Sequence, residues 1–196
     1  MNPFDTLRNY LNKVDSFSKE DVDSFLTYFD KRIIKKKQFV IQPDFVAKYR
    51  IYVAKGAFRA YVIDEDGQEH TISLAMEDWW ISDPNSYYFQ KPATMFVQAL
   101  EDSIIFQLEY DTEKMLKEKF IQFESFFRFT AERGFAYTQR RLIASLTLSA
   151  EERYKEFIKT YPDFIQRIPQ YIVASYLGMT TEYLSRIRNK ESKLKS

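Results

Sequence analysis

The sequence contains no cysteine and a single histidine, His70. Without cysteine the chain cannot form disulfides, thiolate nucleophiles, zinc–thiolate sites or cysteine-ligated iron–sulfur clusters. One imidazole cannot complete a multi-histidine metal site within one chain, and it weakens any hypothesis of Ser-His-Asp chemistry. His70 itself lies in the alternating run QEHTISL, which is typical of a strand. We therefore expect no catalytic residue, no metal and no cofactor, and only carboxylate chemistry stays open for an enzyme.

Glycine and long apolar runs are also scarce. With four glycines in 196 residues, a glycine-rich phosphate-binding loop is not expected. No apolar run approaches the roughly 18 residues that a membrane-spanning helix needs. Asp5 and Arg8 interrupt the N-terminal segment where a leader peptide would be apolar. We therefore expect a cytoplasmic protein with no membrane partner.

The chain is rich in core-forming residues, with 45% hydrophobic and 17% aromatic side chains. Near the N-terminus, apolar residues recur at helical spacing: Phe4, Leu7, Leu11 and Val14. Ser18 precedes Asp21 by three residues, as in a capping box, and predicts the start of a second helix. The sequence therefore begins with two predicted helices.

From about residue 33 to residue 108 the pattern changes to short runs of β-branched and aromatic residues, such as YRIYVA, AFRAYVID and SIIFQLE. Their even spacing predicts an antiparallel sandwich or barrel. Between two of these runs, Asp64-Glu65-Asp66-Gly67 predicts a hairpin turn in which Gly67 has a positive φ.

A second helical region is predicted to begin near Asp111 as one long helix. A coiled-coil-like seam runs along it in alternating steps of four and three residues: Leu116, Phe120, Phe123, Phe127, Thr130, Gly134, Tyr137 and Arg141. Glycine inside a helix costs about 1 kcal/mol relative to alanine, so Gly134 should have a packing reason. We expect a homodimer interface along Phe123, Phe127, Thr130, Gly134 and Tyr137, with close approach at Ala131, Gly134 and Thr138. Burial of the same stripe against the chain's own barrel is the alternative.

Toward the C-terminus, Ser149 and Glu152 predict a capped helix that ends before Pro162. The segment that follows, RIPQYIVASYLGMTTEYLSRIRNK, predicts two short helices around a tight turn at Gly178, with Thr180 as the N-cap of the second. The residues expected to face inward are Ile172, Ala174, Leu177, Leu184 and Ile187. This pattern predicts a helix-turn-helix, although an ordinary helical hairpin can share it.

The outer face of the second helix presents Thr181, Glu182, Ser185 and Arg186. Arginine reads guanine in the major groove, and glutamate can accept from cytosine N4.

The charge distribution of the chain also favours DNA binding. Residues 167–196 hold six basic residues, including Lys190, against two acidic ones, whereas the rest of the chain holds 23 basic and 26 acidic. Such asymmetry favours a phosphate-facing module on an acidic body.

Two helices, a small barrel, a long helix and a C-terminal helix-turn-helix, in this order, resemble the catabolite-activator-like (Crp/Fnr) family of bacterial transcription regulators. The most specific parts are the Lys55-Gly56 step, the DEDGQEHTISL hairpin, the position of EDWWISD and the helix-turn-helix. The run SAEERYKEFIKTYPDFIQRIPQYIVASYLGMTTEYLSRIR resembles the variant that is common in Bacteroidetes.

The resemblance implies an α+β fold with N-terminal helices, an antiparallel barrel of the cyclic-nucleotide-binding jelly-roll type, a long dimerisation helix and a helix-turn-helix domain. We place these parts at residues 1–110, 111–147 and 148–196. The implied function is a homodimeric regulator that binds successive major grooves of a near-palindromic double-stranded operator. RNA polymerase is an expected partner if the protein activates transcription.

By position in the family motif, Thr181, Glu182 and Arg186 match base-reading residues. Thr180 and Ser185 match the helix cap and a supporting position, and we add Lys190 as a candidate for the DNA-binding surface.

The barrel departs from the family members that bind cyclic nucleotides. Those proteins hold the phosphate with a Gly-Glu step and a later Arg-Ser or Arg-Thr pair, whereas this chain has Ser82-Asp83 and Pro92-Ala93. Replacing arginine with proline removes a bidentate cation and a backbone donor together. We therefore expect a degenerate domain that does not bind cyclic AMP.

An unidentified small effector stays open. The pocket candidates are Ser82, Asp83, Lys91 and Thr94, of which the last two could serve another anion or simply lie on the surface. Nearby aromatic residues would suit a planar ligand or core packing: Trp79, Trp80, Tyr87, Tyr88 and Phe89.

Two other functions compete with DNA binding. A barrel of this size could sense a ligand or bind a partner while its helix-turn-helix serves as a protein-interaction element without DNA readout. A cupin-type enzyme shares the sheet architecture, but such enzymes assemble two or three histidines on a metal, and this chain has one.

Overall fold

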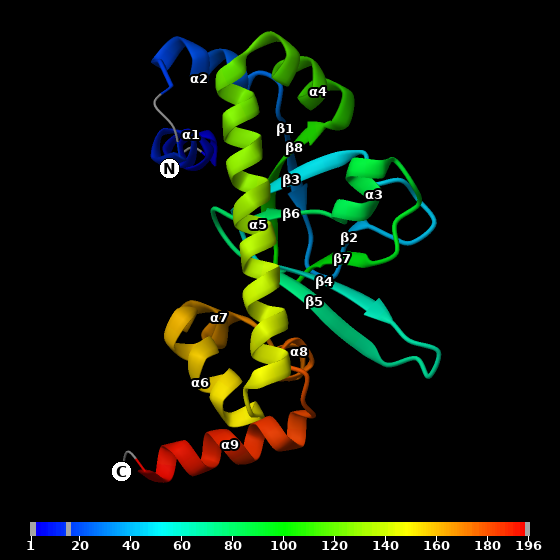
Figure 1. Ribbon diagram of the computed structural model, residues 1–196, viewed down its shortest axis with the longest axis vertical. Helices are drawn as coiled ribbons and strands as arrows, with labels where there is room; N and C mark the ends of the chain where they lie inside the picture. Colours follow the sequence, from blue (N-terminus) through cyan, green and yellow to red (C-terminus); the bar gives the residue numbers. More distant parts are fainter. Residues whose placement is uncertain (1–2, 15–16, 195–196) are drawn as a thin grey trace.

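The computed structural model describes residues 3–14 and 17–194, which form a mixed helical and antiparallel-sheet structure (Figure 1). The N-terminal half contains α1 (Pro3–Val14), α2 (Lys19–Leu26), β1 (Asp30–Ile34), β2 (Phe39–Ile41), β3 (Tyr49–Lys55), β4 (Phe58–Ile63), β5 (Glu69–Ala75), β6 (Trp80–Ile81), α3 (Pro84–Phe89), β7 (Phe96–Ala99) and β8 (Ser103–Glu109). The C-terminal half contains α4 (Tyr110–Lys119), α5 (Ile121–Thr147), α6 (Ala150–Thr160), α7 (Pro162–Arg167), α8 (Gln170–Tyr176) and α9 (Thr181–Leu194).

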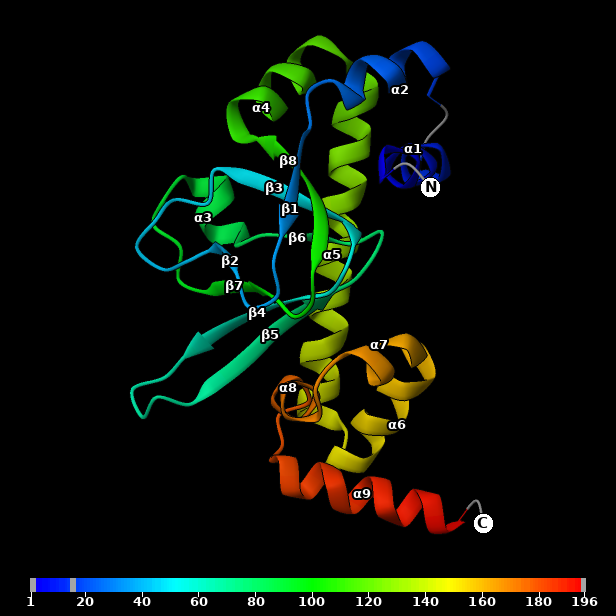
Figure 2. The same cartoon turned by 180° about the vertical axis from the view of Figure 1, so that it is seen from behind.

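The strands form two four-stranded antiparallel sheets, in the orders β1-β8-β3-β6 and β2-β7-β4-β5. Their facing sides share one apolar core, in which Val53 and Ile105 of the first sheet meet Phe58 and Val97 of the second. The β4–β5 hairpin turns at residues 64–68, and Gly67 has a φ of +80°, as the sequence predicts. Figure 2 shows this hairpin extending away from α5.

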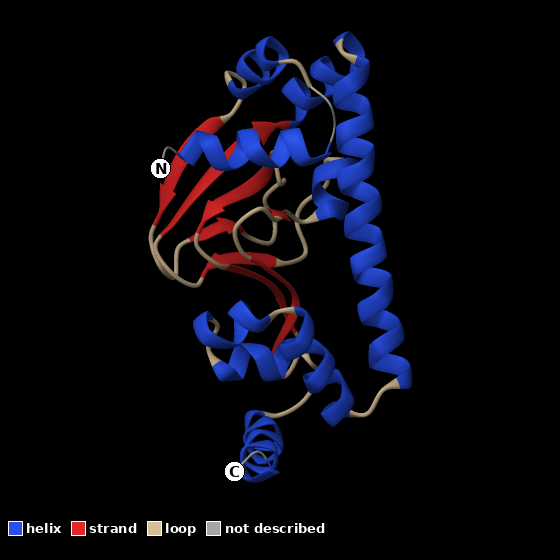
Figure 3. Cartoon of the chain, turned by 90° about the vertical axis from the view of Figure 1, so that its left-hand side faces the viewer, coloured by secondary structure: helices blue, strands red, loops and turns tan. Residues whose placement is uncertain are grey.

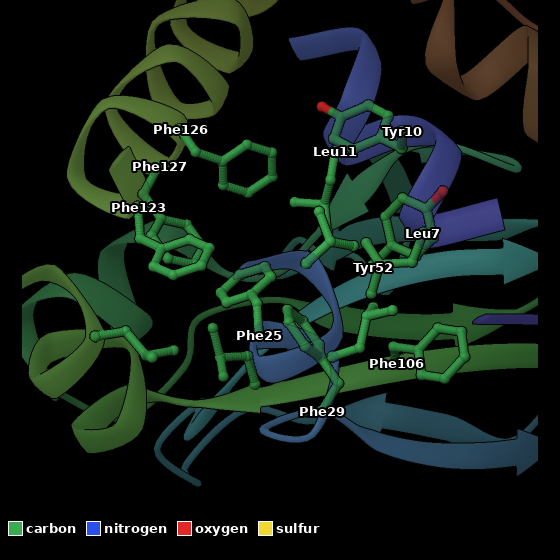
Figure 4. Close-up of a cluster of buried hydrophobic side chains, with 14 of the residues drawn as sticks. Leu7, Tyr10, Leu11, Phe25, Phe29, Tyr52, Phe106, Phe123, Phe126 and Phe127 are labelled. Carbon is green, nitrogen blue, oxygen red and sulfur yellow. The ribbon is translucent and has the colours of Figure 1, made fainter. Parts of the chain in front are cut away.

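The N-terminal helices cover the outer side of the first sheet, and α1 lies across its strands (Figure 3). Leu7 and Leu11 are buried there, as the helical spacing predicts, while the side chain of Val14 lies outside the described residues. Figure 4 shows the aromatic cluster between these helices, the sheet and α5. The ring of Phe25 stacks on that of Phe123, with centroids 4.1 Å apart. Aromatic pairs of this kind add to the free energy gained by burial.

The predicted long helix is two helices, and this corrects the expectation of one continuous helix from Asp111. The break falls at Phe120, whose φ of −134° and ψ of 108° are extended. Its N–H still donates to the carbonyl of Leu116, at 2.9 Å. The chain thus changes direction between α4 and α5, and α5 then runs from the N-terminal helices to the C-terminal helices (Figure 1).

The predicted dimer stripe faces the chain's own core. Phe123 and Phe127 are only 3% and 1% exposed, and Thr130 is 9% exposed. Tyr137 is half-buried and its ring packs on that of Trp79. Packing within the chain therefore takes up Phe123, Phe127 and Thr130 and part of Tyr137, which favours the alternative of burial against the chain's own core. Gly134 alone of the five is exposed, and among the described residues no atom outside its own helix lies within 4 Å of a Cβ added there.

A neighbouring face of α5 carries a different apolar stripe. Phe135, Leu142 and Leu146 are 71%, 58% and 76% exposed, and Ala131 and Thr138 continue the same line at steps of four and three residues. Isolated exposed apolar residues are common, but a continuous line of them on one helix indicates an interaction surface. We call these five residues the exposed α5 stripe.

Among the described residues, no helix combines the length and the apolar character that crossing a membrane requires.

Candidate recognition helix and its support

The turn between α8 and α9 is a Schellman motif. Gly178 has a φ of +67° and its N–H donates to the carbonyl of Ser175, while the N–H of Met179 donates to the carbonyl of Ala174. This is the pair of bonds that closes a helix at a left-handed residue, and glycine adopts that conformation at the least cost. The sequence prediction of a tight turn at Gly178 is confirmed.

Thr180 caps the second helix. Its hydroxyl accepts a hydrogen bond from the N–H of Tyr183, at 3.2 Å, and its carbonyl accepts from the N–H of Leu184. Because the first N–H groups of a helix have no partner within it, this cap fixes where α9 begins.

The two faces of α9 have the predicted orientation. Leu184 and Ile187 are buried, and they pack with the three inward residues predicted on α8 and its turn, Ile172, Ala174 and Leu177. The outward residues are exposed: Thr181, Glu182, Ser185 and Arg186. A packed inner face with a polar, accessible outer face is what a helix needs to enter a DNA groove.

The charge state of the outer face is set locally. Backbone hydrogen bonding at the start of α9 and the hydroxyl of Thr180 lower the pKa of Glu182, and Arg186 lowers it further. The carboxylate is therefore ionised at neutral pH and can only accept hydrogen bonds, as contact with cytosine N4 requires.

Lys190, the remaining candidate for DNA contact, is engaged in an ion pair. Its ammonium group lies 3.0 Å from a carboxylate oxygen of Glu151 on α6. The pair is exposed, so it is worth at most about 1 kcal/mol and would yield to a phosphate at little cost. A contact between Lys190 and DNA stays a prediction.

The four effector candidates do not surround an open site. Asp83 is fully buried at the N-cap of α3, where its carboxylate accepts from the N–H of Ser86 at 3.1 Å and from the N–H of Thr94 at 2.9 Å. Ser82 donates to a backbone carbonyl of Tyr49, and Lys91 is exposed. The structure thus brings Asp83 and Thr94 together as partners of each other. An anion placed here would meet a carboxylate that already holds the donors.

The aromatic residues of this region act in packing. Trp79 lies edge-on to Tyr161 and Phe164 of the C-terminal domain. Tyr87 donates from its hydroxyl to the carboxylate of Glu113, at 2.7 Å. A hollow of about 220 Å³ lies beside β2 and β3, lined by residues from Phe39 to Ile51, and none of the four effector candidates lines it.

A buried ion pair that the sequence did not reveal ties α4 to the barrel. Arg50 on β3 bonds both carboxylate oxygens of Glu113, at 2.6 and 2.8 Å, and Lys117 adds a third contact at 2.7 Å. Arg50 also donates to Tyr88 of α3 and Thr130 of α5. The only sequence signal was Arg50 as a lone charge in the otherwise apolar run YRIYVA.

The described residues thus form two facing antiparallel sheets, a long helix with an exposed apolar stripe and a capped helix-turn-helix. No protein-family model and no curated protein matches the sequence. Solved structures do match.

FixK2 from Bradyrhizobium japonicum is 15% identical, with 85% of each chain covered and a TM-score of 0.73. A regulator assigned to the Crp/Fnr family from Eubacterium rectale is 12% identical over 94% of this chain and 88% of that one, with a TM-score of 0.71. The c-di-GMP responsive global regulator CLP from Xanthomonas campestris is 13% identical over 90% and 92%, with a TM-score of 0.67. The chain therefore has the Crp/Fnr fold, as its sequence predicts.

Proposed function

We propose that this protein is a homodimeric, sequence-specific DNA-binding transcription regulator of the Crp/Fnr type that acts in the cytoplasm. The observation that carries the proposal is the exposed polar face of α9, which presents Glu182 and Arg186. Buried Leu184 and Ile187 on the other face and the cap at Thr180 hold the helix in this orientation. The division into residues 1–110, 111–147 and 148–196 belongs to this proposal. RNA polymerase would be a further partner of an activator.

The exposed α5 stripe supports the homodimer. Pairing Phe135 and Leu142 with the same residues of a second copy would remove apolar surface from water and would place two α9 helices about one two-fold axis. A dimer with two-fold symmetry binds a near-palindromic operator, whose half-sites lie about one helical turn of DNA apart.

The arrangement around Asp83 supports a regulator that does not respond to cyclic AMP. The buried carboxylate takes the two backbone donors of Ser86 and Thr94, so a phosphodiester would find neither donors nor a cation there. Binding to DNA is therefore proposed to need no cyclic nucleotide.

The test is selection of binding sites from a random double-stranded DNA library with the purified protein, without ligand, at two salt concentrations. We expect enrichment of a two-fold-symmetric site and an affinity that falls steeply with salt, because phosphate contacts release counterions. Retention of DNA without any sequence enrichment, or no retention at either salt, would contradict the proposal and favour a barrel that binds a protein partner.

A further inference from the structure

The helix-turn-helix domain is hydrogen-bonded directly to the edge of the barrel. Strand β5 is the last strand of its sheet, so among the described residues one side of its backbone has no strand partner. The hydroxyl of Ser175 on α8 accepts from the N–H of Thr71 and donates to the carbonyl of Glu69, both at 2.9 Å. One side chain of the DNA-binding domain thus makes the two bonds that another strand would make.

Arg141 on α5 completes this contact. Its guanidinium donates to the carbonyl of Ile72 at 2.7 Å, to that of Thr71 at 2.8 Å and to that of Tyr176 at 2.7 Å. The pairing of β4 with β5 shifts register here, since Ala60 pairs with Ser73 and Tyr61 with Thr71. Ile72 is therefore the extra residue of a β-bulge, and its carbonyl is free to accept from Arg141.

These bonds join three parts of the molecule at one point. Arg141 belongs to the helix that carries the exposed stripe, Thr71 and Ile72 belong to the barrel, and Ser175 and Tyr176 belong to the helix that supports α9. We call the side chains of Arg141 and Ser175, with their acceptors and donor on β5, the β5 clamp.

Two further contacts hold the same domains together. Arg167 at the end of α7 makes a bidentate ion pair with Glu77, at 2.7 and 2.9 Å, and also bonds Glu101. Leu74 and Met76 of the barrel are buried in the same core as Tyr154 and Phe157 of α6. The ion pair and the apolar core resist separation of the helix-turn-helix from the barrel. The directional hydrogen bonds of the β5 clamp, in addition, fix the orientation of the helix-turn-helix relative to the barrel and α5.

We propose that Arg141 and Ser175 are positioning residues that fix the recognition helix relative to α5, and so set the half-site spacing that the dimer reads without a small-molecule effector. This inference rests on the proposed DNA-binding function. In a two-fold dimer, the distance and angle between the two α9 helices follow from where each sits relative to its own α5. Neither residue touches the outer face of α9, so neither is expected to change which bases a half-site contains.

The experiment measures binding of the full-length protein to a set of operators that carry the selected half-sites with the spacer changed by one or two base pairs. Each added base pair rotates one half-site against the other by roughly 35°. The parent protein is expected to prefer one spacing by about tenfold or more, an effect of about 1.4 kcal/mol. In Arg141→Gln and Ser175→Ala we expect this preference to fall below about threefold, while the bases selected within each half-site are unchanged.

The matched control is Arg140→Gln, which removes the same charge one residue away. Arg140 is exposed, and within the described residues it makes no hydrogen bond to β5. It should keep the spacing preference of the parent. Arg141→Lys, which keeps the charge but loses the fixed geometry of the guanidinium, should behave like Arg141→Gln.

A second measurement does not depend on DNA. Amide hydrogen exchange at Thr71 should speed up at least about tenfold in Ser175→Ala, because the hydroxyl is the acceptor of that N–H. An unchanged spacing preference in folded variants, or unchanged exchange at Thr71, would overturn the proposed positioning role of Arg141 and Ser175. Absence of any selected site for the parent protein would instead overturn the proposed function, and the inference with it.

Discussion

At the scale of one residue, Asp83 shows how a buried carboxylate holds a loop together. Its carboxylate is buried, caps α3 and bonds the N–H groups of Ser86 and Thr94. These bonds close the segment between β6 and β7 on itself. The sequence did not reveal the bond between Asp83 and the N–H of Thr94, because that bond depends on the distance between residues that are 11 positions apart.

Asp83→Ala should therefore destabilise the barrel. It removes a helix N-cap and leaves the N–H of Thr94 without its acceptor, so we expect a loss of about 1 to 3 kcal/mol in the free energy of unfolding. Asp83→Asn keeps one side-chain oxygen and should lose clearly less. Urea unfolding followed by circular dichroism measures both, and equal stability of the alanine variant and the parent would show that the cap contributes nothing.

Glu113 provides a pH-dependent prediction at the same scale. Burial raises the pKa of this carboxyl, but Arg50 and Lys117 outweigh burial and hold the pKa below its ordinary value of 4.5. A carboxyl whose pKa is lower in the folded state stabilises the fold above its unfolded pKa, and this contribution is lost as the pH falls through the folded value. We expect the free energy of unfolding to decline from about pH 5 downward.

In Glu113→Gln this acid decline should be shallower, and stability at pH 7 should drop by roughly 3 to 5 kcal/mol because the charge of Arg50 is left buried without its partner. Asp102→Asn is the matched control, since it removes an exposed carboxylate whose pKa is also lowered, mainly by the backbone N–H of Lys36. Its effect at pH 7 should be small. Identical pH profiles for the parent and Glu113→Gln would refute the argument.

At the scale of elements, the helix-turn-helix could be predicted from the sequence and the long helix could not. The turn is defined by local signals, namely a glycine with positive φ, a threonine cap and inward apolar residues at fixed spacing. Phe120 carries no such signal, because neither glycine nor proline marks the break between α4 and α5. The side of α5 that faces the core depends on where α2 and the sheet lie, and a heptad pattern cannot distinguish that face from a dimer interface.

The recognition helix carries its own prediction. Arg186→Ala should weaken operator binding by about 1 to 3 kcal/mol and relax specificity at one base pair in each half-site. The parallel variant Lys190→Ala removes a positive charge that is paired with Glu151, and we expect a smaller loss that is uniform across sequences. Site selection and titration with both variants measure this. If Arg186→Ala selected the parental site with parental affinity, the assignment of the reading face would be wrong.

At the scale of the whole molecule, the exposed α5 stripe is where a second copy is expected to pack. Phe135→Glu places a charge in the middle of this stripe, and it should raise the dimer dissociation constant at least about a hundredfold, because burying an unpaired carboxylate is costly. Sedimentation at several protein concentrations measures the change.

The control for the stripe is Phe129→Glu, on another exposed part of α5, beside Arg133. It should leave association unchanged. A Phe135→Glu protein that sediments like the parent would show that the dimer, if formed, uses a different surface. Close approach of two helices near Ala131, Gly134 and Thr138 stays a prediction, and the open space around Gly134 leaves room for it.

The β5 clamp also affects solubility, because it covers part of an edge strand. An uncovered edge strand offers a row of free N–H and C=O groups to any other strand, and proteins usually protect such edges by charge, by bulges or by covering them. In this chain the hydroxyl of Ser175, the guanidinium of Arg141 and a bulge at Ile72 protect β5, and of these only Ser175 belongs to the helix-turn-helix. If the helix-turn-helix separated from the barrel, the N–H of Thr71 and the C=O of Glu69 would lose Ser175 as their partner and this part of the edge would be exposed. Self-association through β5 is then the expected fate of the opened state.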